Sequence, residues 1–181
     1  KGESRLVAAY SKISPPLSVY ERGLCVWDES REAFRPVRTI WREGDPETPF
    51  PDGQASYWTD GSGKRWVVFG NPFPKLKMPA TFEAWQDPTT WVKLEPQKKV
   101  TTADGEEIDV HTGHIVWNEY RQRWIAIFMQ TFAKESNFGE LWYAEADDPT
   151  GPWGPAVKII THDNYTFYNP RIHHEGPSAG E

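Results

Sequence analysis

Alternating apolar and polar residues form the same pattern twice along the chain. Residues 55–70 read ASYWTDGSGKRWVVFG, and residues 113–128 read GHIVWNEYRQRWIAIF. Each stretch begins with a strand-like run that ends near a Trp, passes through a short polar loop, and resumes with Arg-Trp and a run of β-branched and aromatic residues. Period-two patterning on both sides of a polar loop predicts a β-hairpin in each place.

A second pattern follows each hairpin. An apolar strand reaches an acidic turn, and an aromatic residue then opens another short strand. Pro fixes φ and Asp can bond its own turn backbone, so Asp28, Asp87 and Asp148 are interpreted as turn builders. The three copies are residues 23–34 (GLCVWDESREAF), 81–91 (TFEAWQDPTTW) and 140–153 (ELWYAEADDPTGPW).

Four short strands in a unit of about sixty residues are typical of a β-propeller blade. A weak helical pattern at residues 80–85 is assigned to a strand, because the repeat places a strand there. We therefore expect an all-β chain, a partial β-propeller of about three four-stranded antiparallel blades. The alternative is an irregular β-sandwich whose Trp residues recur by chance.

The repeat also predicts the organisation of the chain as a single domain, residues 1–181. The opening KGESRLVAAY aligns with the second strand of the two hairpins, so the chain is expected to begin inside a hairpin turn. An open propeller exposes sheet edges, so a companion chain or self-association is expected to complete the ring. The blade-like units are residues 1–45, 53–98 and 111–162, with the start of a further blade at 166–176.

Composition narrows the classes of partner. The net charge is -6 and no basic residues cluster, which argues against a nucleic-acid partner. A single Cys excludes an intrachain disulfide framework. No apolar run reaches the roughly 18 residues of a membrane-spanning helix, so no membrane partner is expected. Aromatic residues make up 14% of the chain, with 10 Trp, which predicts a largely aromatic core.

Several of these motifs resemble a known group of proteins. The long units and the Asp-Pro-x-Gly-Pro-Trp turn resemble the five-bladed propellers of glycoside hydrolases, namely arabinanases, β-xylosidases and invertases. Residues 111–125, 139–153 and 162–174 are more closely similar to a group of bacterial, planctomycete-like propeller proteins. The resemblance implies a five-bladed ring, a secreted or periplasmic location and hydrolysis of glycosidic bonds. Those enzymes place a base Asp in the first opening strand, which this chain is expected to lack.

In a propeller the opening strands line a central funnel, and residues 54–60, 111–119 and 168–175 are the expected opening strands. His111 and His114 lie in the second of them and are candidate catalytic and metal-binding residues. Imidazole can bind a metal, hydrogen-bond a sugar hydroxyl or move a proton. Residues three apart on a strand face opposite sides, but a bulge at Gly113 could bring the two rings together. The alternative is a His that bonds a loop carbonyl.

Glu140 is the candidate general acid, because its strand begins where it can face the funnel. Glycoside hydrolysis uses two carboxylates, and Glu145 faces the other way in an unbroken strand. The alternative for Glu140 is a salt bridge to Arg121 or Arg123. Two further carboxylates, Asp60 and Glu119, occupy matching hairpin turns and are interpreted as structural.

The candidate substrate-binding residues are Tyr168, Asn169, Arg171 and Trp117. Pro170 favours extended backbone at Asn169, whose amide could then read sugar hydroxyls or bind a cation. Tyr168 and Trp117 could stack on a sugar ring, although Trp117 matches Trp58 in the repeat and packing is the alternative. Further candidates are Lys75 and Lys77, in a Pro-rich loop expected at residues 71–80, for an acidic sugar, and the pair His173 and His174 in the last opening strand.

The leading functional hypothesis is a carbohydrate-active, glycoside hydrolase-like propeller that acts on a poly- or oligosaccharide. A non-catalytic glycan-binding propeller is one alternative. A metal-dependent lyase or oxidase that uses the His cluster is another, and it would require a divalent metal in the central funnel.

Overall fold

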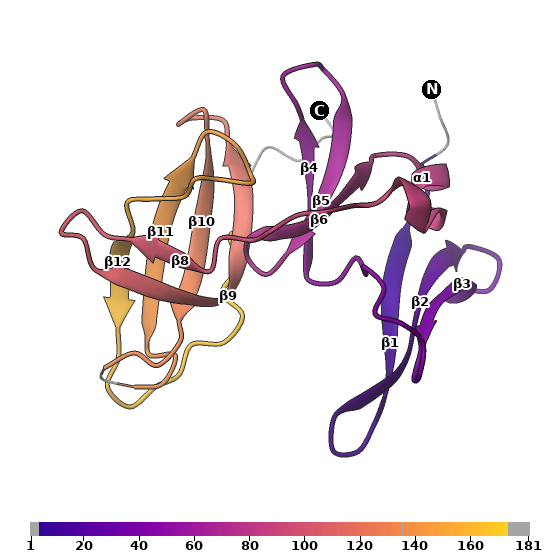
Figure 1. The fold of residues 1–181 in the computed structure, drawn as a ribbon, viewed down its shortest axis with the longest axis horizontal. Coiled ribbons are helices and arrows are strands. Elements are labelled where there is room, and N and C mark those ends of the chain that lie inside the picture. Colours follow the sequence, from indigo (N-terminus) through magenta and orange to yellow (C-terminus); the bar gives the residue numbers. More distant parts are fainter. Residues whose placement is uncertain (1–3, 135, 174–181) are drawn as a thin grey trace. The chain divides into compact units, whose positions relative to one another are not determined.

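The computed structural model describes residues 4–134 and 136–173 of the 181-residue chain (Figure 1). Strands dominate it and form three separate antiparallel sheets. The predicted class, an all-β chain built from the antiparallel blades of a partial propeller, is confirmed.

The first sheet holds the N-terminal copy of the repeat. Its strands are β1 (Val7–Ser14), β2 (Ser18–Asp28) and β3 (Ala33–Arg42), in that order. β1 pairs with β2 from Val7↔Val26 to Ser14↔Ser18, so β1 takes the place of the second strand of the repeat, as the alignment predicted. Only the middle of β2 is fully buried, at residues 23–26.

The second sheet has four strands, as the repeat predicted. They are β4 (Gln54–Thr59), β5 (Arg65–Gly70), β6 (Pro74–Pro79) and β7 (Val92–Lys93). The prediction that residues 81–91 supply the third strand is wrong. That stretch forms helix α1 (Phe82–Gln86) and the 3₁₀ turn η1 (Pro88–Thr90), and β6 is the third strand.

Local chemistry explains this difference. Thr81 caps α1, because its side-chain oxygen accepts a hydrogen bond from the Ala84 N–H at 3.1 Å. Asp87 then caps the 3₁₀ turn through the Thr89 N–H. In β6, Leu76 and Met78 are buried at 1% exposure each, whereas Lys75 is exposed and Lys77 is half-buried, which is the alternation of a strand.

The third sheet is the largest and contains one strand more than predicted. Its order is β12-β11-β10-β9-β8, all antiparallel, and Figure 1 shows it as one curved sheet. β11 alternates strictly between buried and half-buried positions, as expected for a strand with one face on the core. The strands are β8 (Lys99–Thr101), β9 (Glu107–Asn118), β10 (Arg123–Gln130), β11 (Glu140–Ala146) and β12 (Val157–Thr161).

Contacts divide the described chain into two compact units. One comprises residues 4–52, 57–68 and 76–93, and the other residues 53–56, 69–75 and 94–173 without residue 135. Residues 166–173 form no strand, and the remainder of the expected fourth blade, 174–176, lies outside the described residues together with His174. The single domain remains a prediction. No helix within the described ranges has the length and apolar character to cross a membrane.

The acidic turns are built in one way throughout. In each, an Asp Oδ1 accepts hydrogen bonds from both the N–H and the hydroxyl of a Ser or Thr two residues later. This confirms that Asp28, Asp87 and Asp148 are turn builders, and it adds Asp60, which also accepts the Trp66 Nε1–H at 2.8 Å. The four pairs are Asp28–Ser30, Asp60–Ser62, Asp87–Thr89 and Asp148–Thr150.

Replacing Asp148 tests how much one such turn stabilises the fold. Asp148→Ala removes the acceptor of the Thr150 N–H (2.8 Å) and hydroxyl (2.6 Å), so we expect the free energy of unfolding to fall by about 1 kcal/mol. Asp148→Asn keeps an oxygen in place and should lose less than half of that. Urea unfolding with an unchanged m-value is the measurement. Equal losses in the two variants would contradict this account of the turn.

Candidate functional site

The candidate site is centred on the first half of β9, where the strand carries a bulge. Gly113 pairs with Phe128 and Val110 with Gln130, so His111 and Thr112 together lie opposite Met129. An extra residue of this kind bends a strand and changes the direction of its side chains. The sequence correctly predicted an irregularity here, and the bulge lies just before Gly113.

Gly113 is required by the close approach of neighbouring backbone. A Cβ at this position would lie 2.1 Å from the Ile127 carbonyl oxygen and 2.7 Å from the Phe128 Cα. The Gly113 N–H donates to Asn71 Oδ1 at 3.1 Å, and its carbonyl accepts from Gln54 Nε2 at 2.5 Å. Beyond the residues of β9 that pair with β8, side chains from two distant segments therefore bind the backbone N–H and carbonyl of the strand.

A surface pocket of about 170 Å³ opens beside the bulge. Three stretches of chain line it: residues 71–75, residues 96–98 and the start of the bulge. Phe73 and Val110 are among its apolar lining residues, and Lys75, Lys98 and His111 bring nitrogen groups. Apolar walls with a few polar groups are the usual composition of small-molecule sites.

Unpaired polar atoms gather around this bulge. Within the described residues, the buried side-chain atoms without a hydrogen-bond partner include Gln54 Oε1, His111 Nδ1 and Thr112 Oγ1. Such atoms are uncommon in folded proteins and often accompany functional sites.

His111 and His114 have different partners. The His111 ring lies against the Phe138 ring at a centroid distance of 4.3 Å. His114 accepts the Ile172 N–H at its Nδ1, at 3.1 Å, which brings the segment that contains Arg171 to β9. Among residues 4–134 and 136–173, no group of three or more His, Cys, Asp or Glu is arranged to hold a metal ion. The metal role of the two histidines remains a sequence-based hypothesis.

An aromatic loop, residues 162–168, is attached close to His111. The Phe167 N–H donates to the Phe138 carbonyl at 3.1 Å, and the Thr166 hydroxyl donates to the Asn137 carbonyl at 2.9 Å. Tyr165 packs edge-on against the Phe167 ring at 5.4 Å and remains 57% exposed. The loop therefore presents aromatic surface beside the chain segment that stacks on His111.

Three of the four predicted substrate-binding residues are exposed, and the fourth is half-buried. Tyr168, Asn169 and Arg171 are exposed, and Tyr168 is 76% exposed. The expectation of extended backbone at Asn169 is wrong: its φ is +48°, a left-handed conformation that Asn tolerates better than most residues. Trp117 is half-buried opposite Trp124, and the two rings meet edge-on at 6.1 Å. This contact supports the packing interpretation of Trp117.

The two lysines of the expected Pro-rich loop, Lys75 and Lys77, have different surroundings. Lys75 lines the pocket, whereas the Lys77 amine lies 4.6 Å from the centroid of Trp66 and 5.1 Å from that of Trp58. Lys77 thus takes part in cation–π contacts on the second sheet.

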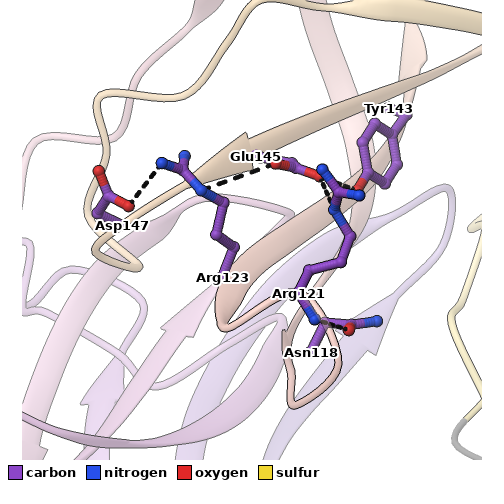
Figure 2. A network of polar contacts seen from close by, with 6 residues as sticks. All are labelled: Asn118, Arg121, Arg123, Tyr143, Glu145 and Asp147. Atoms are coloured by element: carbon purple, nitrogen blue, oxygen red, sulfur yellow. Dashed lines mark hydrogen bonds and ion pairs between the residues drawn. The ribbon is translucent and has the colours of Figure 1, made fainter.

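Glu140, the candidate general acid, is buried at 2% exposure and forms an ion pair with Lys158 at 2.5 Å. A salt bridge, the structural alternative for Glu140, is therefore present, but the expected partners, Arg121 or Arg123, were wrong. Both arginines turn to Glu145 instead (Figure 2). Side chains alternate between the two faces of β11, so Glu140 and Glu145, five residues apart, point to opposite faces. The two carboxylates therefore have different partners.

The Glu145 network ties the β9–β10 turn to β11 (Figure 2). Arg121 donates to Glu145, Tyr143 donates its hydroxyl proton to the same carboxylate at 2.5 Å, and Arg123 pairs with Asp147 at 3.0 Å. Hydrogen bonds from Arg121 and then Tyr143 lower the pKa of Glu145. Burial, and then the bond to Glu145, raises the pKa of Tyr143 to about 12.

Comparison with known proteins gives a distant likeness. No protein-family model matches the sequence, and no curated protein matches it. A family 43 glycoside hydrolase, the YxiA protein of Bacillus licheniformis, is similar at 18% identity and a TM-score of 0.38, over 74% of this chain and 32% of that one. Endo-1,5-alpha-L-arabinanase of Thermotoga petrophila is similar at 15% identity and a TM-score of 0.38, over 74% of this chain and 32% of that one.

The chain spans about a third of the length of these two structures. They are of the glycoside hydrolase type that the motifs resemble. The resemblance to the planctomycete-like group is untested by these comparisons and stays a prediction.

Replacing Glu140 tests whether its ion pair with Lys158 stabilises the fold. Glu140→Gln removes the charge that compensates Lys158, so we expect the free energy of unfolding to fall by about 1–3 kcal/mol. Glu107→Gln makes the same change in an ion pair with Lys99 whose Glu side chain is 60% exposed, and it should stay within about 0.5 kcal/mol of wild type. Thermal unfolding measures both. Wild-type stability in Glu140→Gln would contradict a structural role for the pair.

The raised pKa of Tyr143 predicts a feature in alkaline titration. A folded-state pKa above the unfolded value of 10.0 means that this phenol stabilises the fold fully below pH 10, and that the contribution is lost as the pH rises toward 12. Phenolate absorbance should therefore show one step near pH 12, and Tyr143→Phe should abolish it. Tyr120→Phe, at a site 94% exposed, should leave that step in place. A step that survives in Tyr143→Phe would assign it to another residue.

Proposed function

We propose that this chain is part of a carbohydrate-active β-propeller and that the pocket beside the β9 bulge binds a saccharide. The single observation that carries the proposal is the composition of this pocket. Phe73 and Val110 offer apolar walls, while Lys98 and His111 offer hydrogen-bonding groups, all within about 170 Å³. Sugars combine C–H faces with hydroxyl groups and need both kinds of surface.

The aromatic loop adds support. Exposed Tyr165 offers a ring face of the kind that packs on a sugar, and the loop is attached to Phe138, which in turn stacks on His111. Aromatic side chains carry much apolar area at a low cost in conformational entropy. The pocket and the loop together would give a saccharide one polar subsite and one stacking surface.

Binding is better supported than hydrolysis by the described residues. Glycosidic-bond cleavage usually takes two carboxylates, and the carboxylate of Glu140 is paired with the amine of Lys158. The hydrolase-like activity on a poly- or oligosaccharide therefore remains a prediction from sequence, as do secretion and a companion chain. The roles of His114, Asn169 and Arg171 are likewise predictions from sequence.

Polysaccharide affinity electrophoresis tests the proposal. A panel of arabinan, xylan and homogalacturonan should include at least one polymer that retards the wild-type protein. His111→Phe keeps a ring against Phe138 but removes both nitrogens, so retardation should weaken by roughly three- to tenfold, the value of one hydrogen bond. Because Nδ1 is unpaired in the fold, thermal stability should not fall.

Two exposed tyrosines give a matched comparison on the same gels. Tyr165→Ala should weaken retardation, because it removes the exposed ring of the aromatic loop. Tyr120→Ala, in the β9–β10 turn and 94% exposed, should not. No retardation by any polymer, or equal retardation of wild type and His111→Phe, would refute saccharide binding at this pocket.

A further inference from the structure

The β10–β11 loop, residues 131–134 and 136–139, is attached to two neighbouring residues of the pocket lining. At its start, Gln130, the last residue of β10, pairs with Val110 of β9. At its end, the Phe138 ring lies against the His111 ring at a centroid distance of 4.3 Å. Val110 and His111 both line the pocket, so the loop begins and ends beside it.

Two phenylalanines of this loop have a left-handed backbone conformation. The φ angle is +57° at Phe132 and +58° at Phe138. A positive φ is unfavourable for a bulky side chain. Elsewhere in the described part of the chain, the non-Gly residues with a positive φ are the polar residues Glu32, Gln122 and Asn169. The β10–β11 loop therefore keeps two bulky residues in a conformation that polar residues or Gly adopt more easily.

Packing explains Phe138 but leaves Phe132 without a structural reason. Phe138 is half-buried and stacks on His111, so its ring contributes to the fold. Phe132 is 79% exposed, so its ring gains little from burial to offset the strain of its backbone. A residue that breaks a local rule without a gain in stability is a candidate for a role in function.

Hydrogen bonds join the β10–β11 loop to the aromatic loop. The Ser136 hydroxyl donates to the Tyr165 carbonyl at 3.2 Å, and the His162 N–H donates to the Gly139 carbonyl at 2.9 Å. The two loops therefore support each other next to the pocket residue His111, and each presents an exposed aromatic ring.

The surroundings of Phe132 favour a sugar over a protein or a lipid surface as the occupant. Lys134 and Asn137 of the same loop are exposed, and so is Asn164 of the aromatic loop. Phe132 and Tyr165 are thus single rings among polar residues, whereas protein- and membrane-binding surfaces are usually contiguous apolar patches of roughly 300 Å² or more. A single ring face with amide and amine groups nearby suits the C–H face and the hydroxyl groups of a sugar.

We propose that Phe132 is a stacking platform for a sugar unit next to the one in the pocket, so that the site selects an oligosaccharide over a monosaccharide. The proposal deepens the saccharide binding proposed above and rests on it. The pocket volume of about 170 Å³ is below the roughly 300 Å³ at which pockets for drug-sized ligands begin, so the pocket has room for one sugar unit. Further units lie outside it, where the β10–β11 loop offers the exposed ring of Phe132.

Titration of the full chain by NMR tests this preference for chain length. The probes are arabinose, xylose and galacturonic acid, each compared with its linear tetrasaccharide. At least one tetrasaccharide should bind at least threefold more tightly per sugar unit than its monosaccharide, which is the contribution of one stacked ring. Phe132→Gly should remove this preference and leave monosaccharide binding unchanged, whereas Phe132→Tyr, which keeps a ring, should retain it. Tyr120→Gly, which removes a ring that is 94% exposed in the β9–β10 turn, is the control and should bind as wild type does.

Thermal unfolding separates binding from a structural role of the ring. Phe132→Gly should unfold at or above the wild-type temperature, because Gly adopts a positive φ without strain. A clearly lower unfolding temperature would show that the ring stabilises the fold and would overturn the proposal.

Each other result has a distinct meaning. Equal binding per sugar unit of monosaccharide and tetrasaccharide overturns the platform but leaves saccharide binding in the pocket in place. A preference that survives in Phe132→Gly, or is lost equally in Tyr120→Gly, overturns the assignment to Phe132. Self-association of the wild type that Phe132→Gly abolishes in sedimentation reassigns the ring to a protein contact. No shift of pocket resonances with any of these sugars overturns both proposals.

Discussion

The close approach of β9 to β10 at Gly113 is the constraint on which the candidate site depends. The Ile127 carbonyl occupies the space that any Cβ at position 113 would need. The bulge at His111 and Thr112 shifts the register of β9 by one residue just before Gly113. The N–H and carbonyl of Gly113 are then available to Asn71 and Gln54, and the pocket forms beside them.

Hydrogen-bond accounting explains why such a site is polar. Side chains, rather than a further strand, pair with the backbone of β9 beyond β8, since Asn71 and Gln54 bind the N–H and carbonyl of Gly113. Polar side chains are therefore drawn to this stretch, and buried side-chain atoms that lack a partner, on Gln54, His111 and Thr112, lie in the same place.

Local patterns in the sequence predicted most of the fold. The two hairpins and the Asp turns were found because side-chain alternation and turn chemistry act within a few residues. β6 was missed because prolines at positions 74 and 79 indicated a loop, although the alternation from Lys75 to Met78 was present. A strand with Pro at its ends is compatible with a sheet, and the weak helical pattern at residues 80–85 was outweighed by the repeat.

The candidate site was less predictable, because its geometry comes from contacts between distant residues. The sequence singled out His111 and Lys75 but could not show that they line one pocket, since this depends on the bulge and on residues 96–98. The alternative of a salt bridge from Glu140 to Arg121 or Arg123 named the wrong partners, because both arginines pair with Glu145 and Glu140 pairs with Lys158. Facing is a property of each strand and can be read from sequence. Which strand edges and loops meet in space is a property of the whole unit, and the chemistry of the pocket arises at that level.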